Sequence, residues 1–420
     1  MPEKKPPYKP SRTFDVSLRI KEMDYTNDLS SIRIISSLTA MFQVVIISLY
    51  VDPNDMILKQ VYGQDSIKLS VSFIGLGGGM SDAKQIEFDL LCLKTDFPIT
   101  HNVGGQFGEK NQGQNKDRAK ITMITVSRIG YTVMSRNVNA VYGVVDSKKT
   151  MKLALEDLTT KVGGTLKLDQ DDLYSSDIDQ LIIPPSTYSN AIKYLDGIWG
   201  IFNGVTGSFC QYDGSVYIMN LTARIKKNPN IVVQYMSLDG TSEKTDKLMK
   251  DSNDGKTFYT HSKIKTQNSE NTVFGVYGQT LKHIVKPKDT LSHTITQDMS
   301  DLCSRYGLIS QNDQVNVNHS VDRTRYYNEH SGADYDETFA KSLISKKISD
   351  LASITFDLNN CIRFQKLLLV GSCLRIKAES MDHIPISNNY ILSVSDLTLF
   401  KNPDWHVNAK LKCIRTNKSI

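Results

Sequence analysis

The sequence predicts a mainly β protein with several helices, an α+β fold in which two β-barrel domains accompany a helix-containing middle domain. Near each end of the chain, an apolar strand pattern precedes a glycine turn and an alternating strand. Residues 42–51 and 67–73 form one such unit, and residues 354–358 and 374–377 form the other. Between them, residues 150–162 place apolar side chains on helical spacing. Paired strand units of this kind are typical of barrels that close rings.

The first barrel is expected over residues 14–145. Apolar and polar residues alternate from Phe14 to Ile20, the pattern of a half-buried strand. Residues 42–51 are so continuously apolar that we expect this strand to be buried on both faces, by the barrel interior on one side and by a helix or neighbour on the other. Further strands are expected at residues 67–73, 86–93 and 121–129.

The middle domain is expected over residues 146–225 and 246–332. One helix is predicted at residues 150–162, ending at a glycine pair, and a second at residues 186–202. Asp213-Gly214, between two short apolar runs, predicts a tight hairpin. The polar stretch at residues 239–254 is expected to be a loop.

The second barrel is expected over residues 226–245 and 333–420, with a helix at about residues 336–351. Its strands are expected at residues 231–236 and 354–358 and near Leu374, Ile391 and Leu411.

Residues 1–13 predict an extended arm before the first barrel. Four prolines disfavour a packed element, and Lys4, Lys5, Lys9 and Arg12 make the segment basic. Two interpretations stay open, a disordered tail and an arm that lies on a neighbouring subunit.

Composition excludes several classes of protein. The chain has 420 residues, of which 40% are hydrophobic and 23% charged, as in ordinary globular proteins. The net charge of +5 is spread along the chain, so sequence-specific nucleic acid binding is not indicated. No apolar stretch reaches the roughly 18 residues of a membrane helix, so we expect a protein that is not membrane-embedded.

The cysteines are widely spaced and form no C-x-x-C pair. They are Cys92, Cys210, Cys303, Cys361, Cys373 and Cys413. We expect free buried thiols, as in a protein assembled in a reducing cytosol.

Two clusters could suggest ligand binding, but neither has the required pattern. The glycines at residues 75–79 lack the Gly-Lys-Ser/Thr of a phosphate-binding loop, which favours a hairpin loop. The acidic cluster has Leu173 and Tyr174 where a calcium loop needs an oxygen ligand and a glycine, so a solvated turn is favoured. Its members are Asp169, Asp171, Asp172, Asp177 and Asp179.

Enzyme motifs are not found either. The eight histidines form no H-E-x-x-H motif, and the sequence contains no G-x-S-x-G elbow. The sequence therefore predicts no enzyme, with no catalytic, cofactor-binding or metal-binding residues and no cofactor.

The order of elements resembles the central baseplate hub protein of contractile-tailed phages, the myovirus tail hub family. The resemblance depends on Asp52 with the turn at residues 62–67, on the Trp199 helix after Pro184-Pro185, and on the last strands. These last strands are expected at residues 367–371, 390–394 and 411–415.

This resemblance implies two tail-tube-like β-barrels per chain and a homotrimer. Three copies would form a pseudo-sixfold ring that joins the hexameric tail tube to the trimeric central spike and lines the channel for genome passage. The implied partners are the central spike protein, tail tube proteins, baseplate wedge proteins and the tape measure protein. The implied location is the virion tail baseplate, assembled in the host bacterial cytoplasm.

Two other classes stay open. A receptor- or glycan-binding tail protein would cluster aromatic side chains on loops, whereas the 19 tyrosines here are dispersed. An enzyme of unrecognised type would need a constellation of catalytic residues that the sequence does not reveal.

Overall fold

The computed structural model gives a mainly β chain with four α-helices in the part that it describes. It describes residues 14–52, 55, 58, 61, 65–73, 85–96, 119–143, 146–173, 177–178, 180–202, 204–235, 256–260, 264–267, 280–286, 293–298, 323–328, 331–332, 353–359, 361, 364–378, 389–402 and 404–414. The α+β fold class predicted from the sequence is confirmed.

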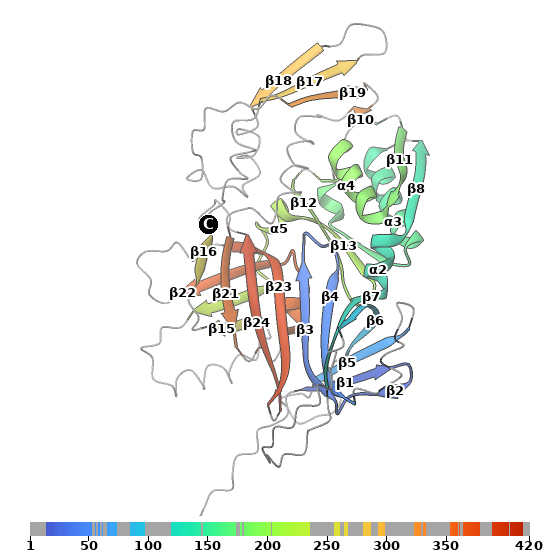
Figure 1. The fold of residues 1–420 in the computed structure, drawn as a ribbon. Helices are drawn as coiled ribbons and strands as arrows, with labels where there is room; N and C mark the ends of the chain where they lie inside the picture. Colours follow the sequence, from blue (N-terminus) through green and yellow to red (C-terminus); the bar gives the residue numbers. More distant parts are fainter. Residues whose placement is uncertain are drawn as a thin grey trace, which may run out of the picture.

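One 14-stranded sheet dominates the structure (Figure 1). Its strands are β1 (Phe14–Ile20), β2 (Met23–Asp24), β3 (Leu29–Ser37), β4 (Gln43–Val51), β5 (Ile67–Phe73), β6 (Gln85–Asp96), β7 (Ala119–Ser127), β14 (Ile231–Tyr235), β15 (Thr257–Thr260), β16 (Lys265–Gln267), β21 (Ser353–Leu358), β22 (Cys373–Ala378), β23 (Asn389–Asn402) and β24 (Asp404–Ile414). The main path runs β15-β14-β22-β23-β3-β4-β7-β6-β5-β1-β2, and β24, β21 and β16 branch from β23. Both strand-rich ends of the chain therefore belong to the same sheet.

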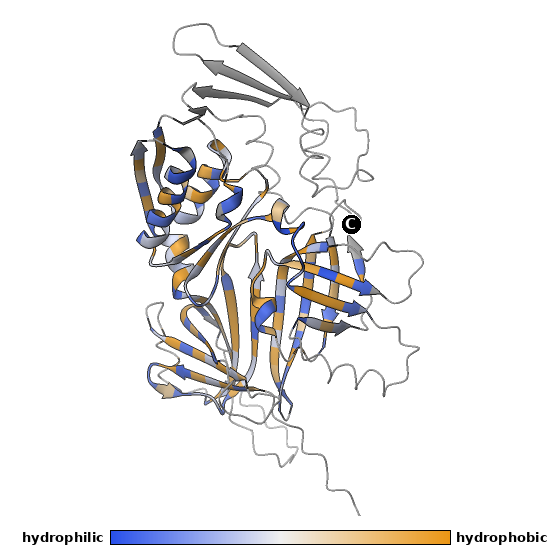
Figure 2. Cartoon of the chain, turned by 180° about the vertical axis from the view of Figure 1, so that it is seen from behind, coloured by the Kyte–Doolittle hydropathy of each residue, from blue (hydrophilic) through white to orange (hydrophobic). Residues whose placement is uncertain are grey.

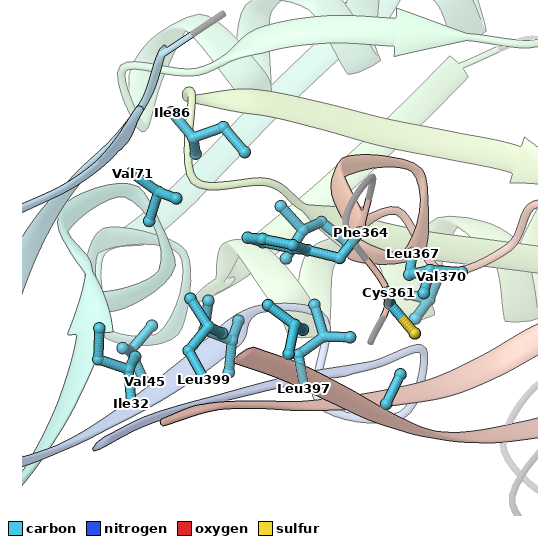
Figure 3. Packing of buried hydrophobic residues seen from close by; sticks show 14 of the residues in the cluster. Ile32, Val45, Val71, Ile86, Cys361, Phe364, Leu367, Val370, Leu397 and Leu399 are labelled. Atoms are coloured by element: carbon cyan, nitrogen blue, oxygen red, sulfur yellow. The ribbon is translucent and has the colours of Figure 1, made fainter. Parts of the chain in front are cut away.

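The two ends meet where β23 pairs antiparallel with β3. On the inner side of this seam, Ile34 lies opposite Leu397 and Ile32 opposite Leu399, all fully buried. Phe364, from a short 3-10 helix, packs against Phe73 with 5.3 Å between the ring centroids. Figure 3 shows Phe364 among buried side chains that include Leu397 and Leu399 of the seam. The seam and this ring contact give the two ends a single shared core.

Strand pairing does not close a barrel at either end within the described residues. At the C-terminal end, however, the end strand β15 approaches β21, and the Thr260 hydroxyl donates a hydrogen bond of 2.7 Å to the Asp357 carbonyl oxygen. The two closed barrels stay a prediction.

A second core lies under the helices. Its elements are α2 (Arg128–Ser135), α3 (Ser147–Lys161), α4 (Tyr188–Ile198), the paired strands β8 (Asn137–Gly143) and β11 (Gln180–Thr187), and β9 (Thr165–Leu168). Both predicted middle helices are confirmed as α3 and α4. Helix α3 ends before Gly163, whose φ of 77° suits glycine, whereas α4 begins later than predicted because residues 186–187 complete β11.

A hairpin separates the two cores. Its strands, β12 (Thr206–Cys210) and β13 (Ser215–Asn220), pair antiparallel around Gly214, as the Asp-Gly turn predicts. Because side chains alternate across a strand, Phe209 enters the first core and Cys210 the second. The hairpin therefore packs against both cores and connects the helical part to the large sheet.

The remaining described elements are short. They are α5 (Leu221–Arg224), the 3-10 helices η2 (Gln170–Asp172) and η5 (Phe364–Leu368), the paired strands β10 (Asp177–Ile178) and β20 (Ser331–Gly332), and the sheet of β17 (Thr280–Lys286), β18 (His293–Asp298) and β19 (Arg323–Asn328).

One expectation about an apolar run was wrong. Residues 367–371 were expected to form a strand, but Leu367 and Leu368 lie in η5, where both are fully buried. A short apolar run fits a buried helix as well as a strand.

Strand β4 was expected to be covered by the barrel interior on one face and by a helix or neighbour on the other. Val45 and Ile47 are fully buried on the inner face. On the other face, Ile46 is half-buried and Tyr50 is 46% exposed. Cover of this face by a neighbour stays a prediction.

Two further differences arise near residue 128. Residues 121–129 were expected to be one strand, but β7 ends at Ser127, whose hydroxyl caps α2 by accepting a hydrogen bond from the Gly130 N–H. Strand β8, which lies inside the expected first barrel, pairs with β11 in the helical part. The predicted domain borders stay predictions.

Several expectations lie outside the described residues. They concern the arm at residues 1–13, the turn at residues 62–64, the glycines at residues 75–79, the loop at residues 239–254 and the helix at residues 336–351.

Candidate functional site: an uncovered sheet face

Part of the large sheet forms a continuous antiparallel wall. Its strands, in order, are β16, β21, β24, β23, β3, β4, β7 and β6, and every neighbouring pair is antiparallel. Figure 1 shows β21, β24, β23, β3 and β4 side by side, and none of the described helices lies in front of them. We call the eight antiparallel strands the sheet wall, and the side that no described helix covers the wall face.

Inward and outward side chains alternate along the strands of the sheet wall. In Figure 2, hydrophobic and hydrophilic residues alternate along many strands. On β4, Val45 and Ile47 are fully buried in the first core. Val44 and Ile46 point the other way and are half-buried on the wall face. The register places Ile46 beside Arg33 of β3, so apolar and charged side chains mix on this face.

An ion pair crosses the seam on the wall face. Arg33 Nε lies 2.8 Å from Asp396 Oδ1, and Arg33 Nη2 lies 2.7 Å from Asp396 Oδ2. This hydrogen bonding raises the pKa of the Arg33 guanidinium above its ordinary value. The two residues are 363 positions apart, so the bidentate pair joins opposite ends of the chain.

Beyond the seam, the wall face is strongly charged. A shallow hollow of about 510 Å³ lies over β16, β21, β24 and β23. Its charged lining residues are Lys265, Asp357, Asp396, Lys410 and Lys412. Lysines and aspartates alternate across neighbouring strands here, with Lys410 opposite both Asp357 and Asp396. Such a surface provides diffuse charge of both signs rather than a pocket for one ligand.

The acidic cluster seen in the sequence is not one solvated turn. Asp169 accepts hydrogen bonds from Arg224 at 2.7 and 3.1 Å and from the Asn220 N–H at 3.1 Å, and its side chain is only 15% exposed. Arg224 also reaches the Gly371 carbonyl oxygen at 3.4 Å. Asp171, by contrast, is exposed. Arg224 therefore connects Asp169 to the segment just before β22 of the large sheet.

The remaining candidate residues give no reactive constellation in the described part of the chain. No group of three His, Cys, Asp or Glu side chains there could hold a metal ion. The described cysteines are free and buried, and burial raises the pKa of Cys210 and of Cys361 to about 12. His406 stacks on Phe400 at 5.5 Å.

Exposed aromatic residues are also scattered. Tyr50 on β4 and Tyr131 on α2 are the exposed large aromatic residues of the described part, and they lie on different elements. None of the helices described is both long enough and apolar enough to span a membrane.

The fold is shared with phage tail proteins. The tail protein from Neisseria meningitidis MC58 aligns with a TM-score of 0.54 and 9% identity, over 95% of this chain and 96% of that protein. The 43 kDa tail protein of prophage MuSo2 from Shewanella oneidensis aligns with a TM-score of 0.51 and 10% identity, over 96% and 98% of the two chains. No family model matches the sequence, and no curated protein matches it by sequence.

The resemblance that the sequence suggested is thus confirmed at the level of the fold. Sequence reasoning missed the seam and the wall face. No local signal could have found Arg33 and Asp396, because nothing near either residue indicates its partner.

Proposed function

We propose that this chain is a structural virion protein, a trimeric baseplate hub that joins the hexameric tail tube to the trimeric central spike. The observation that carries the proposal is the β3–β23 seam, through which one chain presents two strand-rich halves in a single continuous wall. The shared fold with two phage tail proteins over nearly the whole chain supports it.

Symmetry gives the seam its significance. Closed rings repeat the same surface in every subunit. If each chain supplies two tube-like units, three chains offer six near-equivalent positions to a hexameric tube while keeping threefold symmetry toward a trimeric spike. The shared core and the seam would hold the two units of each chain in a fixed relation.

The wall face is the proposed lining of the channel. No described helix covers it, it is continuous across the seam, and its charges are mixed. A channel that passes a polyanion needs a wall without strong attraction at any one point, because tight binding of phosphates to clustered cations would retard passage. Arg33 is paired with Asp396, and Lys410 lies opposite Asp357 and Asp396, so no cluster of unpaired cations forms at these positions.

The function proposed is non-enzymatic. The partners are the central spike protein, the tail tube, the baseplate wedge and the tape measure protein, in a virion tail assembled in the bacterial cytoplasm. Assembly and genome passage would depend on the shape of the ring and on its diffuse charge, and no cofactor is required.

Native mass spectrometry of the full chain tests this proposal, alone and mixed with the spike and tube proteins of the same tail. Three copies per complex are expected with the spike, even if the isolated chain is monomeric, because obligate assemblies can depend on their partners. A chain that stays monomeric with both partners would overturn the hub. Binding to host cell-surface glycans without any tube or spike complex would favour a receptor-binding tail protein.

A further inference from the structure

A hollow of about 340 Å³ lies between the start of β1 and the end of the β23–β24 hairpin. Its lining residues include Phe14, Asp15, Ser17, Asn27, Asp404 and Trp405. Trp405 is half-buried and packs against the first core, so its ring has a fixed place in the hollow. Side-chain alternation along β24 puts Trp405 on the same side of the sheet as the buried Val407, away from the wall face.

The polar groups around this ring suit a segment that carries positive charge and free carbonyl groups. Asp15 and Asp404 supply two carboxylates, against the one ammonium group of Lys401. The exposed side-chain amide of Asn27 can donate hydrogen bonds to carbonyl oxygens. A matching ligand would combine cations, carbonyl groups and compact apolar rings.

The arm at residues 1–13, which lies outside the described residues, has this chemistry. Pro7 and Pro10 form a P-x-x-P pattern, with Lys9 between them and Arg12 shortly after. A polyproline II helix has three residues per turn and no internal hydrogen bonds, so it would place both proline rings on one side and leave its carbonyl groups free. Proline-rich segments of this kind bind grooves lined by aromatic side chains.

We propose that the hollow binds the proline-rich arm of the same chain, with Pro7 and Pro10 against Trp405 and the basic side chains of the arm near the two carboxylates. Phe14, the first residue of β1, lines the hollow, so the arm starts at its rim. Pro10 is four residues before Phe14, which is about 12 Å along an extended chain. A tether this short gives the arm an effective concentration in the millimolar range at its own hollow, which favours it over the arm of another copy.

Disulfide trapping in the full chain tests this contact. Ser11→Cys places a thiol on the arm, and Ser17→Cys places one in the hollow at an exposed position. The matched control combines Ser11→Cys with Gln85→Cys, because Gln85 is exposed and does not line the hollow. Both sites are about 10 Å from Phe14, Ser17 along β1 and Gln85 two strands away across β5. Cys303→Ser in the background removes the cysteine that lies outside the described residues.

The pair at positions 11 and 17 should form a disulfide within one chain at least about tenfold faster than the control pair. The reason is that a docked arm holds its thiol beside the hollow, whereas a free arm reaches both sites about equally. Mass spectrometry after alkylation of the remaining thiols counts the bond. A denaturing non-reducing gel shows whether the bond joins one chain or two.

Two variants of the arm test how it is recognised. Pro7→Ser with Pro10→Ser removes the P-x-x-P pattern and should reduce the cross-linking rate to that of the control pair. Pro2→Ser with Pro6→Ser removes the same number of prolines outside the pattern and should leave the rate unchanged.

Three results would overturn the proposal. Equal rates for the two cysteine pairs would mean that the arm does not occupy the hollow. Covalent dimers or larger species would assign the hollow to the arm of a neighbouring copy. A fast bond within one chain that persists without Pro7 and Pro10 would mean that proline rings are not what the hollow recognises. None of these results depends on the trimer or on the spike protein, so the hub proposal is tested separately.

Discussion

Arg33 of β3 and Asp396 of β23 form a bidentate ion pair across the strand junction that makes one sheet from both ends of the chain. The pair lies on the wall face, above the inner contacts of Ile32 and Ile34 with Leu399 and Leu397. Because the apolar contacts lie in the core and the ion pair is in contact with water, we expect the core to supply most of the stability of the seam.

A double-mutant cycle on this pair should therefore give a small coupling. Arg33 is 51% exposed, and exposed pairs contribute little, so Arg33→Ala and Asp396→Ala should couple by about 0.5–1 kcal/mol in the free energy of unfolding. Urea unfolding of the two single variants and the double variant measures it. The Lys94–Asp96 pair within β6 is the control and should couple less, because it joins no distant segments. A coupling of several kcal/mol would show that the ion pair itself holds the seam.

Asp169 should matter more than its neighbours in the acidic cluster. Asp169→Asn leaves the largely buried Arg224 without its carboxylate and should lower the free energy of unfolding by about 2–3 kcal/mol, the scale of charge-assisted hydrogen bonds. Asp171→Asn changes an exposed side chain and should stay within about 0.5 kcal/mol. Chemical unfolding measures the free energy of unfolding of both variants. If Asp169→Asn lowered it as little as Asp171→Asn, the ion pair of Asp169 with Arg224 would contribute no stability.

The two faces of β4 should respond differently when a charged side chain is introduced. Ile47→Asp places a carboxylate in the first core, where an unpaired charge costs several kcal/mol, about the whole stability of a domain. Ile46→Asp faces outward beside Arg33 and should cost much less. Soluble yield and the urea midpoint measure both variants. Equal loss would mean that the wall face is buried in the folded protein.

Stability at low pH should depend on Asp157. Hydrogen bonds from Tyr142 and Lys161 lower the pKa of this carboxyl below its ordinary value of about 3.9. Since the folded state favours the ionised form, this contribution is complete above about pH 4 and is lost as the pH falls through the lowered pKa. Tyr142→Phe should therefore reduce the dependence of unfolding free energy on pH in that window. Tyr194→Phe, at a half-buried tyrosine whose pKa is raised by burial alone, is the control and should leave the slope unchanged.

The cysteines should all be free thiols. The described ones are buried and unpaired, and the raised pKa of Cys210 and Cys361 leaves little thiolate near neutral pH. Thiol titration of the denatured protein should count six with or without prior reduction. A lower count without reductant would reveal a disulfide. Reaction of the native protein should be much slower than reaction of the denatured protein.

The sequence by itself determined the local elements. Alternation fixed which side chains of β1 and β5 face the core, because side-chain direction has a period of two in any strand. Helical spacing and a terminal glycine located α3, and Asp213-Gly214 located the hairpin of β12 and β13. These features depend only on neighbours a few residues away, so one sequence was sufficient to predict them.

Tertiary structure alone decided which strands pair and which charges meet. The seam of β3 with β23 and the joint of Asp169 with Arg224 bring together distant segments. Likewise, the apolar run around Leu367 is part of a 3-10 helix whose Phe364, Leu367 and Leu368 are buried in the first core. The pairing partner of a strand is selected by packing over the whole core, and local periodicity is the same whichever partner is chosen.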